Sequence, residues 1–474
     1  MKYQYDDNNA ELIKQIIESS LNIKVNDIKL IGNGNDSYVY EVDNIIFKFS
    51  RHEKASENLK KEINILKFLE GKLTLQIPKV LYVGEPNEIF PYYFCGQSKI
   101  EGVPLSPEIY EELSLEDEEQ LAKDLANFLH ELHHIPFNEY RENTIDNFKK
   151  DYEKLKELVY DKLDEITKQK IDNMYMELFN NSDFLNCENS LIHNDFSCNN
   201  IMFNPNTKRV SGIIDFGDAC VSDLDNDFYC LLEDSDEELG ISFGLKVLKN
   251  YGCNDIERMF RKSFFHEKYW CIEQILYGYE YGYQNWIEEG LIALKDQMSF
   301  YDIETPTRLM NFMNANIKYG WVDKQGDKHF NNLEGFRENY RISTIDEMLE
   351  TGLGTCIEQA KMIKFFFDKI GLENKLYCHR SYETEENFDK EVRMHCFVLF
   401  KYNDCWYHFE HSNRPKRGIH KYESLEKAIE EITSGYEEGD IRKLTEIDSI
   451  PDGLSFKEFN QFVNEFDNIK SNVL

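Results

Sequence analysis

Two short apolar segments end in polar side chains of the kind that phosphoryl transfer requires. Asp195 follows the apolar run that begins at Leu191, and Asn200 stands five residues later. Asp215 follows a second apolar run that ends at Ile214. In phosphoryl transfer one carboxylate orients the attacking hydroxyl, while an amide and a second carboxylate hold Mg²⁺. The spacing therefore predicts a catalytic Asp195 and a magnesium site formed by the oxygen ligands of Asn200 and Asp215.

A glycine-containing loop and a lysine precede these segments. Residues 32–37 read Gly-Asn-Gly-Asn-Asp-Ser and stand between two predicted strands. A hairpin tip of this kind, with Gly32, Gly34 and Ser37, can cover phosphates with backbone N–H groups. Lys48 stands among apolar residues of the next strand, where an unpaired ammonium is costly. Its candidate partners are nucleotide phosphates and Glu62, which lies on the inward side of a helix predicted near residues 53–69. The alternative is an edge-strand lysine whose ammonium extends to water.

The composition restricts the classes of partner. The 474 residues include 54 basic and 88 acidic side chains, for a formal charge of -34, and 41% of them are hydrophobic. A core large enough for two or three domains is therefore expected. The charge argues against nucleic acid and anionic membranes as partners, because both require basic patches. It favours a cationic substrate through long-range steering, although it suits solubility alone equally well.

Cysteine usage and the N-terminus predict a cytoplasmic protein. The eleven cysteines include no C-x-x-C pair, which argues against a zinc site and a disulfide framework. The N-terminal residues form no apolar signal segment, and no apolar run approaches transmembrane length. Both observations suit a reducing compartment.

Acidic and aromatic side chains gather downstream of Asp218. The run Glu233–Glu238 contains three glutamates, namely Glu233, Glu237 and Glu238, and the later stretch 277–286 holds four tyrosines and Trp286. Carboxylates suit ammonium groups, and aromatic faces suit sugar rings. The region therefore predicts a binding site for an amino sugar. The alternative is an acidic helix start followed by a core helix.

These motifs together resemble the aminoglycoside phosphotransferases, most closely their 2''-phosphotransferase branch. The resemblance covers about residues 25–296 and rests on the segment 191–227, Lys48, Glu62 and the stretch 277–286. It implies a bilobal protein-kinase-like fold that uses ATP or GTP with Mg²⁺ to phosphorylate a hydroxyl of a cationic aminoglycoside. In that branch a histidine often stands at the second metal position, where this chain has Asn200, as the wider kinase-like group does.

The last third of the chain contains a second set of chemical groups. Thr355 and Glu358 form a predicted capping box, which places Cys356 in the first turn of a helix, where the dipole favours a thiolate. His395 begins one arm of a predicted hairpin and Glu410 ends the other, so they are candidate cross-strand neighbours. A thiol, an imidazole and a carboxylate form the nucleophile, base and orienting group of covalent catalysis.

This tail, over about residues 305–425, resembles the transglutaminase-like (papain-like) fold. The Gly-x-Cys helix start, the histidine and the Trp406–Glu410 motif carry the resemblance, with glutamate where the family has aspartate. The predicted class is α+β, with a kinase-like domain over 1–298 and a transglutaminase-like domain over 299–474. Two alternatives stay open: a kinase for another hydroxylated amine, and a cysteine amidase or acyltransferase whose kinase-like lobe only binds ligand.

Overall fold

The chain forms two compact units. The computed structural model describes residues 10–233, 235, 237–297, 300, 303–382, 392–434 and 441–471. The first unit extends to Tyr269 and includes Leu276–Ile287, and the second comprises Trp270–Ile275 and the chain from Glu288 onward. The predicted domain boundary between residues 298 and 299 lies outside the described residues.

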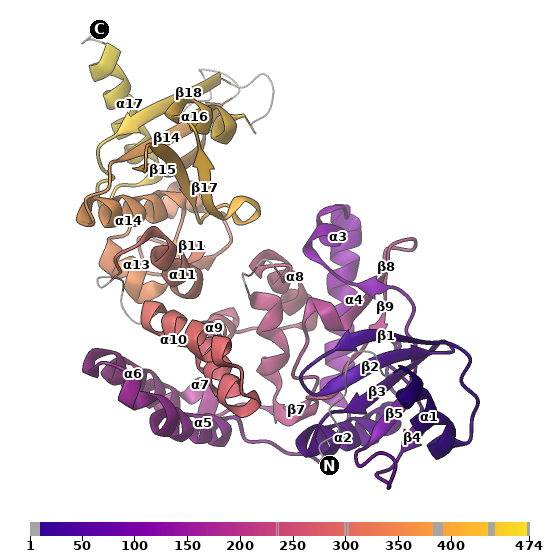
Figure 1. The fold of residues 1–474 in the computed structure, drawn as a ribbon. Helices are drawn as coiled ribbons and strands as arrows, with labels where there is room; N and C mark the ends of the chain where they lie inside the picture. The colour runs from indigo at the N-terminus through magenta and orange to yellow at the C-terminus, as the bar shows by residue number, and fades with distance from the viewer. Residues whose placement is uncertain are drawn as a thin grey trace. The chain divides into compact units, whose positions relative to one another are not determined.

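An antiparallel sheet in the order β1-β2-β3-β5-β4 begins the first unit (Figure 1). Alternating side chains bury Tyr38 and Tyr40 from one strand and Phe47 and Phe49 from the next, against α1 and its surroundings. Helix α2 begins after the N-cap His52 and packs Leu59 and Ile63 toward Cys95 of the sheet. The elements are α1 (Ala10–Leu21), β1 (Ile28–Asn33), β2 (Ser37–Val42), β3 (Ile45–Ser50), α2 (Glu53–Leu69), β4 (Val80–Gly84) and β5 (Phe94–Ser98).

The rest of the first unit is mainly helical. Helix α4 buries a stripe of leucines that includes Leu125 and Leu129, as its spacing of three and four predicts. Two small sheets, β6-β8-β9 and β10-β7, carry the loops that follow β7 and β9. The elements are β6 (Val103–Pro104), α3 (Pro107–Glu111), α4 (Leu115–His134), α5 (Thr144–Val159), α6 (Glu165–Asn180), α7 (Ser182–Leu185), β7 (Asn189–Ile192), β8 (Ile201–Asn204), β9 (Arg209–Ile213), β10 (Cys220–Asp223), α8 (Ile241–Tyr251) and α9 (Ile256–Tyr281).

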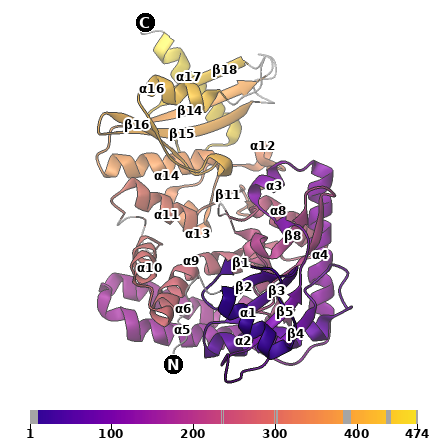
Figure 2. The same cartoon turned by 45° about the vertical axis from the view of Figure 1, so that its right-hand side comes forward.

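The second unit is built on an antiparallel sheet in the order β17-β16-β15-β14-β18. Helix α14 packs on one face, beside Cys378 and Cys396, and α16 packs on the other, beside Tyr377 and Phe397 (Figure 2). The elements are α10 (Gln284–Gln297), α11 (Pro306–Asn316), β11 (Lys318–Val322), β12 (Lys328–Phe330), α12 (Phe336–Asn339), α13 (Ile345–Thr351), β13 (Leu353–Gly354), α14 (Cys356–Lys369), β14 (Asn374–Tyr382), β15 (Arg393–Tyr402), β16 (Cys405–Glu410), β17 (Gly418–Tyr422), α16 (Leu425–Thr433), β18 (Ile441–Ile447) and α17 (Phe456–Ser471).

Among the described residues, no helix combines the length and the apolar character that crossing a bilayer requires.

Candidate active sites

Lys48 is the centre of an ion-pair network in the first unit. Its neighbours in β3, Phe47 and Phe49, point into the core, so the alternation of the strand turns Lys48 to the other face. There its Nζ lies 2.8 Å from Glu62 Oε1 and 2.9 Å from Asp215 Oδ1. Burial alone lowers the pKa of Lys48, but the two carboxylates outweigh burial and raise it. The lysine is therefore held charged beside Asp215.

Asp215 is oriented by its backbone as well as by Lys48. Its φ of 63° lies in the left-handed region, which residues other than glycine rarely adopt. The charge of Lys48 lowers the pKa of this carboxyl and outweighs desolvation. Lys48 and the N–H of Gly217 both contact Oδ1, at 2.9 and 3.4 Å. Oδ2 is thus the oxygen that these contacts leave for a ligand.

Asn200 connects the predicted catalytic loop, which we define as residues 193–200, to the segment that carries Asp215. Its Nδ2 donates to Asp195 Oδ2 at 2.8 Å and to the backbone oxygen of Asp195 at 2.9 Å. Its backbone oxygen accepts the N–H of Ile214 at 2.9 Å. Because the Nδ2 contacts point to Asp195, the Oδ1 of Asn200 is the amide atom suited to a metal. The structure therefore brings Asp195, Asn200 and Asp215 together, as their spacing predicts.

The donor set fits Mg²⁺. Asn200 Oδ1 and Asp215 Oδ2 are hard oxygen donors that the contacts described above do not use. Mg²⁺ is typically held by one or two carboxylates together with phosphates and water, rather than by a complete cage of side chains. Two protein oxygens beside the predicted phosphate-binding Lys48 fit that pattern.

Asp227 stabilises the backbone of the catalytic loop. Its fully buried carboxylate accepts the backbone N–H of His193 at 2.9 Å and of Asn194 at 2.6 Å. His133 of α4 contacts the same carboxylate at 3.1 Å and Tyr251 at 2.9 Å. Neither Asp227 nor His133 was among the predicted site residues. The sequence contains no spacing signal that joins two positions 94 residues apart.

Comparison with known proteins agrees with this geometry. Residues 27–260 match the model of APH, the phosphotransferase enzyme family. The gentamicin complex of APH(2")-IIa is similar, with 32% identity and a TM-score of 0.55, covering 61% of this chain and 97% of that chain. The chain belongs to the phosphotransferase enzyme family.

Further solved structures are similar to this phosphotransferase. The ADP-bound aminoglycoside phosphotransferase APH(2")-Ib has 32% identity and a TM-score of 0.53, covering 60% of this chain and 96% of that chain. The streptomycin–ATP ternary complex of APH(2")-IIa has 31% identity and a TM-score of 0.55, covering 62% of this chain and 99% of that chain. The N-terminal part therefore has the predicted kinase-like fold, and the part of the family prediction that is confirmed is membership of the phosphotransferase enzyme family.

The glycine-containing hairpin of the phosphotransferase differs in detail from the predicted loop. Strand pairing continues through Asn33, after a bulge between Leu30 and Gly32, so the connecting segment shrinks from residues 32–37 to 34–36. Gly32 therefore lies within β1, and Ser37 begins β2. The N–H of Gly34 donates to the oxygen of Ser37 at 3.0 Å, which closes the tip. The prediction missed the bulge because turn-forming residues also occur at the ends of twisted strands.

The tip of this hairpin is tied to helix α9. The hydroxyl of Tyr281 donates to Asp36 Oδ1 at 2.8 Å, and His52 Nε2 lies 3.2 Å from the same oxygen. Nearby, Lys54 pairs with Glu280 at 2.6 Å. Hydrogen bonds thus connect the aromatic stretch of α9 to the tip of the glycine-containing hairpin. The sequence contains no local signal for this connection.

The residues proposed for substrate binding fall into different environments. Glu238 is buried, and its carboxylate accepts the N–H of Cys198 at 3.2 Å, which places it against the catalytic loop. Burial raises the pKa of Glu238 to about 7, and the charge of Asp195 adds to this effect. Glu233 is partly buried, and Glu237 is exposed. Trp286 is half-buried and packs on Tyr283, with ring centroids 5.1 Å apart. The role of these four residues in binding an amino sugar stays a prediction.

The second unit brings Cys356, His395 and Glu410 together. Thr355 caps α14 in a complete capping box with Glu358, so Cys356 occupies the first helical position. His395 Nε2 lies 2.9 Å from Glu410 Oε2, and the Cys356 thiol contacts the backbone oxygen of Met394, the residue before His395, at 3.7 Å. Burial lowers the pKa of His395, but Cys356 and Glu410 raise it to about 10. His395 is thus held protonated near the helix N-terminus that carries Cys356.

Two hydrogen bonds hold the side chain of Glu410, which is one methylene longer than the aspartate of the transglutaminase-like family. Its Oε1 accepts the hydroxyl of Ser412 and the N–H of Asn413, both at 2.9 Å, which leaves Oε2 directed at His395. Burial raises the pKa of Glu410, but the His395 hydrogen bond and charge lower it to about 2. His411, the residue after Glu410, contacts Gln359 Oε1 at 2.8 Å.

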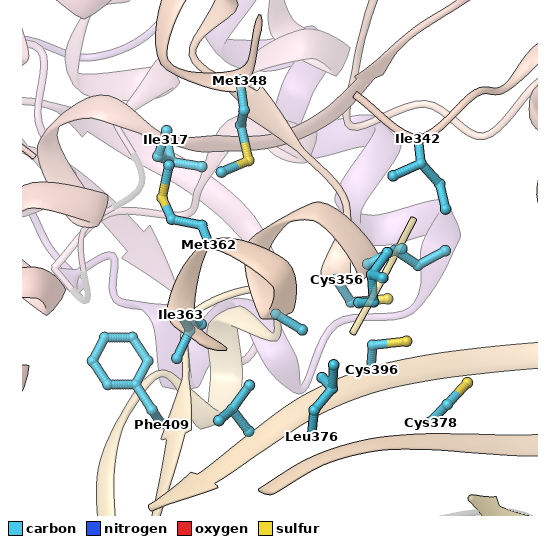
Figure 3. Packing of buried hydrophobic residues seen from close by; sticks show 14 of the residues in the cluster. Ile317, Ile342, Met348, Cys356, Met362, Ile363, Leu376, Cys378, Cys396 and Phe409 are labelled. Carbon is cyan, nitrogen blue, oxygen red and sulfur yellow. The ribbon is translucent and has the colours of Figure 1, made fainter. Parts of the chain in front are cut away.

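Two further thiols accompany Cys356. Cys378 and Cys396 are paired positions on β14 and β15, and Figure 3 shows both beside Cys356 within the apolar core. Both thiols are almost completely buried. Burial raises the pKa of Cys396 well above its ordinary value, which marks it as a packing residue and Cys356 as the candidate nucleophile.

Proposed function

We propose that the first unit transfers the γ-phosphoryl group of ATP or GTP to a hydroxyl of an aminoglycoside. The observation that supports this most directly is the pairing of Lys48 with Glu62 and Asp215, next to the Asp195–Asn200 contact. Similar structures are complexes with gentamicin, or with streptomycin and ATP. The net charge of -34 suits a polycationic substrate, because it attracts such a substrate over long distances.

In this mechanism the protein mainly positions charges. Asp195 accepts a hydrogen bond from the drug hydroxyl and takes its proton as the new oxygen–phosphorus bond forms. Lys48 holds the nucleotide phosphates, and Glu62 fixes the Lys48 ammonium. Mg²⁺ held by Asn200 and Asp215 would neutralise charge on the phosphates. Asp227 keeps the catalytic loop in place through two backbone N–H groups. Electrostatic stabilisation of this kind is usually the largest contribution to catalysis.

A substrate panel tests this assignment against the nearest alternative. Purified protein is incubated with Mg²⁺, ATP or GTP, and either kanamycin, gentamicin or simple amino alcohols, and phosphorylated products are measured by mass spectrometry. The proposal expects one or more aminoglycosides to be phosphorylated far faster than the amino alcohols. Turnover of an amino alcohol with none of the aminoglycosides would instead assign a kinase for another hydroxylated amine.

For the second unit we propose a cysteine-dependent amidase or acyltransferase. The contact between His395 and Glu410 supports it, together with Cys356 at the start of α14, whose thiol contacts the backbone of Met394 next to His395. The Cys356 sulfur forms a bond to an amide carbonyl, the C–N bond breaks, and the amine leaves with a proton from His395. Water or a second amine then attacks the thioester, gives its proton to His395 and restores the thiolate. Selective alkylation of Cys356 by iodoacetamide tests the nucleophile; reactivity no higher than that of the half-buried Cys405 would reject it.

A further inference from the structure

A short basic segment adjoins the Cys356 site. The basic turn, which we define as Arg414–Arg417, reads Arg-Pro-Lys-Arg and begins four residues after Glu410. The sequence has no aspartate or glutamate between His411 and Tyr422, although the whole chain has a charge of -34. Three cations in four residues are therefore a local reversal of the overall charge.

The basic turn is fixed to the catalytic carboxylate. The two residues before it, Ser412 and Asn413, are the ones that donate to Glu410 Oε1. At its other end, Arg417 Nε donates to the backbone oxygen of His411 at 3.1 Å, which folds the segment back on itself. Gly418 then adopts a φ of 142° and pairs with Glu410 as β17 begins. The position of the turn relative to Glu410 is thus set by the backbone.

The basic turn also contacts the strand that pairs with β16, which carries Glu410. His408 and Glu410 share one face of β16, and His408 Nε2 lies 3.6 Å from Glu410 Oε2. The backbone oxygen of Lys416 contacts His420, which is paired with His408 on the neighbouring strand. Burial lowers the pKa of His408 to about 4, and the positive charge of Lys416 is among the groups that add to this lowering. Lys416 itself is exposed, so its ammonium is available to a solute.

We propose that the basic turn is an anion-binding subsite of the second unit, which selects acyl substrates that carry a negatively charged group near the reacting carbonyl. The inference depends on the proposed role of Cys356 as a nucleophile. An anionic substrate is repelled by a protein of charge -34, so a local cluster of cations is needed to attract and orient it. Arginine and lysine side chains bind carboxylates and phosphates through charge-assisted hydrogen bonds.

Two alkylating reagents of similar size and different charge test the subsite. Iodoacetate is an anion and iodoacetamide is neutral, and each forms a sulfur–carbon bond to Cys356 with loss of iodide. Rates at Cys356 are measured in the full chain by mass spectrometry. We expect Lys416→Glu to lower the iodoacetate-to-iodoacetamide rate ratio by about fivefold. The iodoacetamide rate should stay within about twofold of the wild-type rate.

Lys421→Glu is the matched control. Lys421 is exposed on β17 opposite Tyr407, and the alternation of the strand directs it to the other face from His420. The same charge change there should leave the ratio unaltered. The wild-type ratio should also fall as salt is added, a measurement that needs no variant. An unchanged ratio in Lys416→Glu with a reactive Cys356 overturns the subsite alone. A Cys356 that reacts no faster with iodoacetamide than Cys405 overturns the proposed nucleophile, and the subsite with it.

Discussion

The ammonium of Lys48 lies 2.9 Å from Asp215 Oδ1, although 167 residues separate the two positions in the chain. A second contact, 2.8 Å to Glu62 Oε1, joins α2 to the same lysine. One side chain therefore connects the five-stranded sheet, the helix beside it and the proposed metal loop. An arrangement of this kind positions a cation for nucleotide phosphates before any nucleotide is bound.

Lys48→Met is expected to lower kcat/KM for phosphoryl transfer by about a hundredfold, because a preorganised donor to the phosphates is lost. Lys149→Met is the matched control, since Lys149 forms an exposed pair with Asp146. That control should change the rate by no more than about twofold. Steady-state kinetics of both variants with nucleotide and kanamycin measure the difference. Equal rates for the two variants would contradict the role of Lys48.

Asp227→Asn is expected to lower kcat while KM for the drug changes little. The amide can no longer accept the N–H groups of both His193 and Asn194 with two equivalent oxygens, so the catalytic loop loses a brace. The free energy of unfolding of Asp227→Asn should be lower than that of wild type by about 1–3 kcal/mol. Asp172→Asn is the control. Asp172 also accepts two hydrogen bonds, both from tyrosine hydroxyls at 2.6 Å, but it lies on α6, outside the catalytic loop. A similar loss of stability with unchanged kcat in both variants would show that Asp227 is only structural.

Tyr281→Phe is expected to raise KM for the nucleotide by about fivefold, because one hydrogen bond to a carboxylate is lost and the hairpin tip gains freedom. Tyr279→Phe is the control: it removes a hydroxyl from the same helix, which donates to the backbone oxygen of Leu158 and accepts from the Lys162 ammonium. The ratio of nucleotide KM values between the two variants is the readout. If Tyr279→Phe has the larger effect, the connection between α9 and the hairpin does not control nucleotide binding.

The His395–Glu410 pair should stabilise the second unit within a defined pH range. The pKa of His395 rises from 6.5 to about 10, so its contribution is full below pH 6.5 and is lost as the pH rises through 10. The pKa of Glu410 falls from 4.5 to about 2, so its contribution is full above pH 4.5 and is lost as the pH falls through 2. The pair therefore stabilises most between pH 4.5 and 6.5.

Urea unfolding of His395→Gln and of a control, His420→Gln, checks this prediction. The wild-type protein and the control should lose stability between pH 6.5 and 10, while His395→Gln should show a smaller loss. Tryptophan fluorescence reports on the second unit through Trp321 and Trp406, which are both buried there. The same alkaline decline in all three proteins would contradict the raised pKa of His395.

Local patterns were sufficient to predict much of both sites. Strand-end polar residues predicted Asp195, Asn200 and Asp215, because an apolar run followed by a polar group places that group at the end of a strand. The capping box around Thr355 predicted the start of α14 and with it the position of Cys356. In each case the signal lies within a few residues.

Contacts between distant segments could not be predicted in this way. His133 and Asp227 are 94 residues apart, and Tyr281 and Asp36 are 245 apart. Each of these side chains has an ordinary local explanation, as a helix end, a turn or a core aromatic. Only the packing of α4 and α9 against the loops shows which polar atoms meet. The bulge before Gly32 was missed for a related reason, since register depends on the partner strand.

The central claim is that Asp195 activates the drug hydroxyl in a phosphoryl-transfer site. The decisive experiment compares wild type and Asp195→Asn in single-turnover transfer of phosphate with Mg²⁺ present. The donor is ATP or GTP, and the acceptor is an aminoglycoside that the wild-type protein phosphorylates. Nucleotide affinity is measured for both proteins alongside. The account predicts that Asp195→Asn binds nucleotide as wild type does and transfers phosphate about a hundred to ten thousand times more slowly. Transfer at the wild-type rate by Asp195→Asn would contradict it.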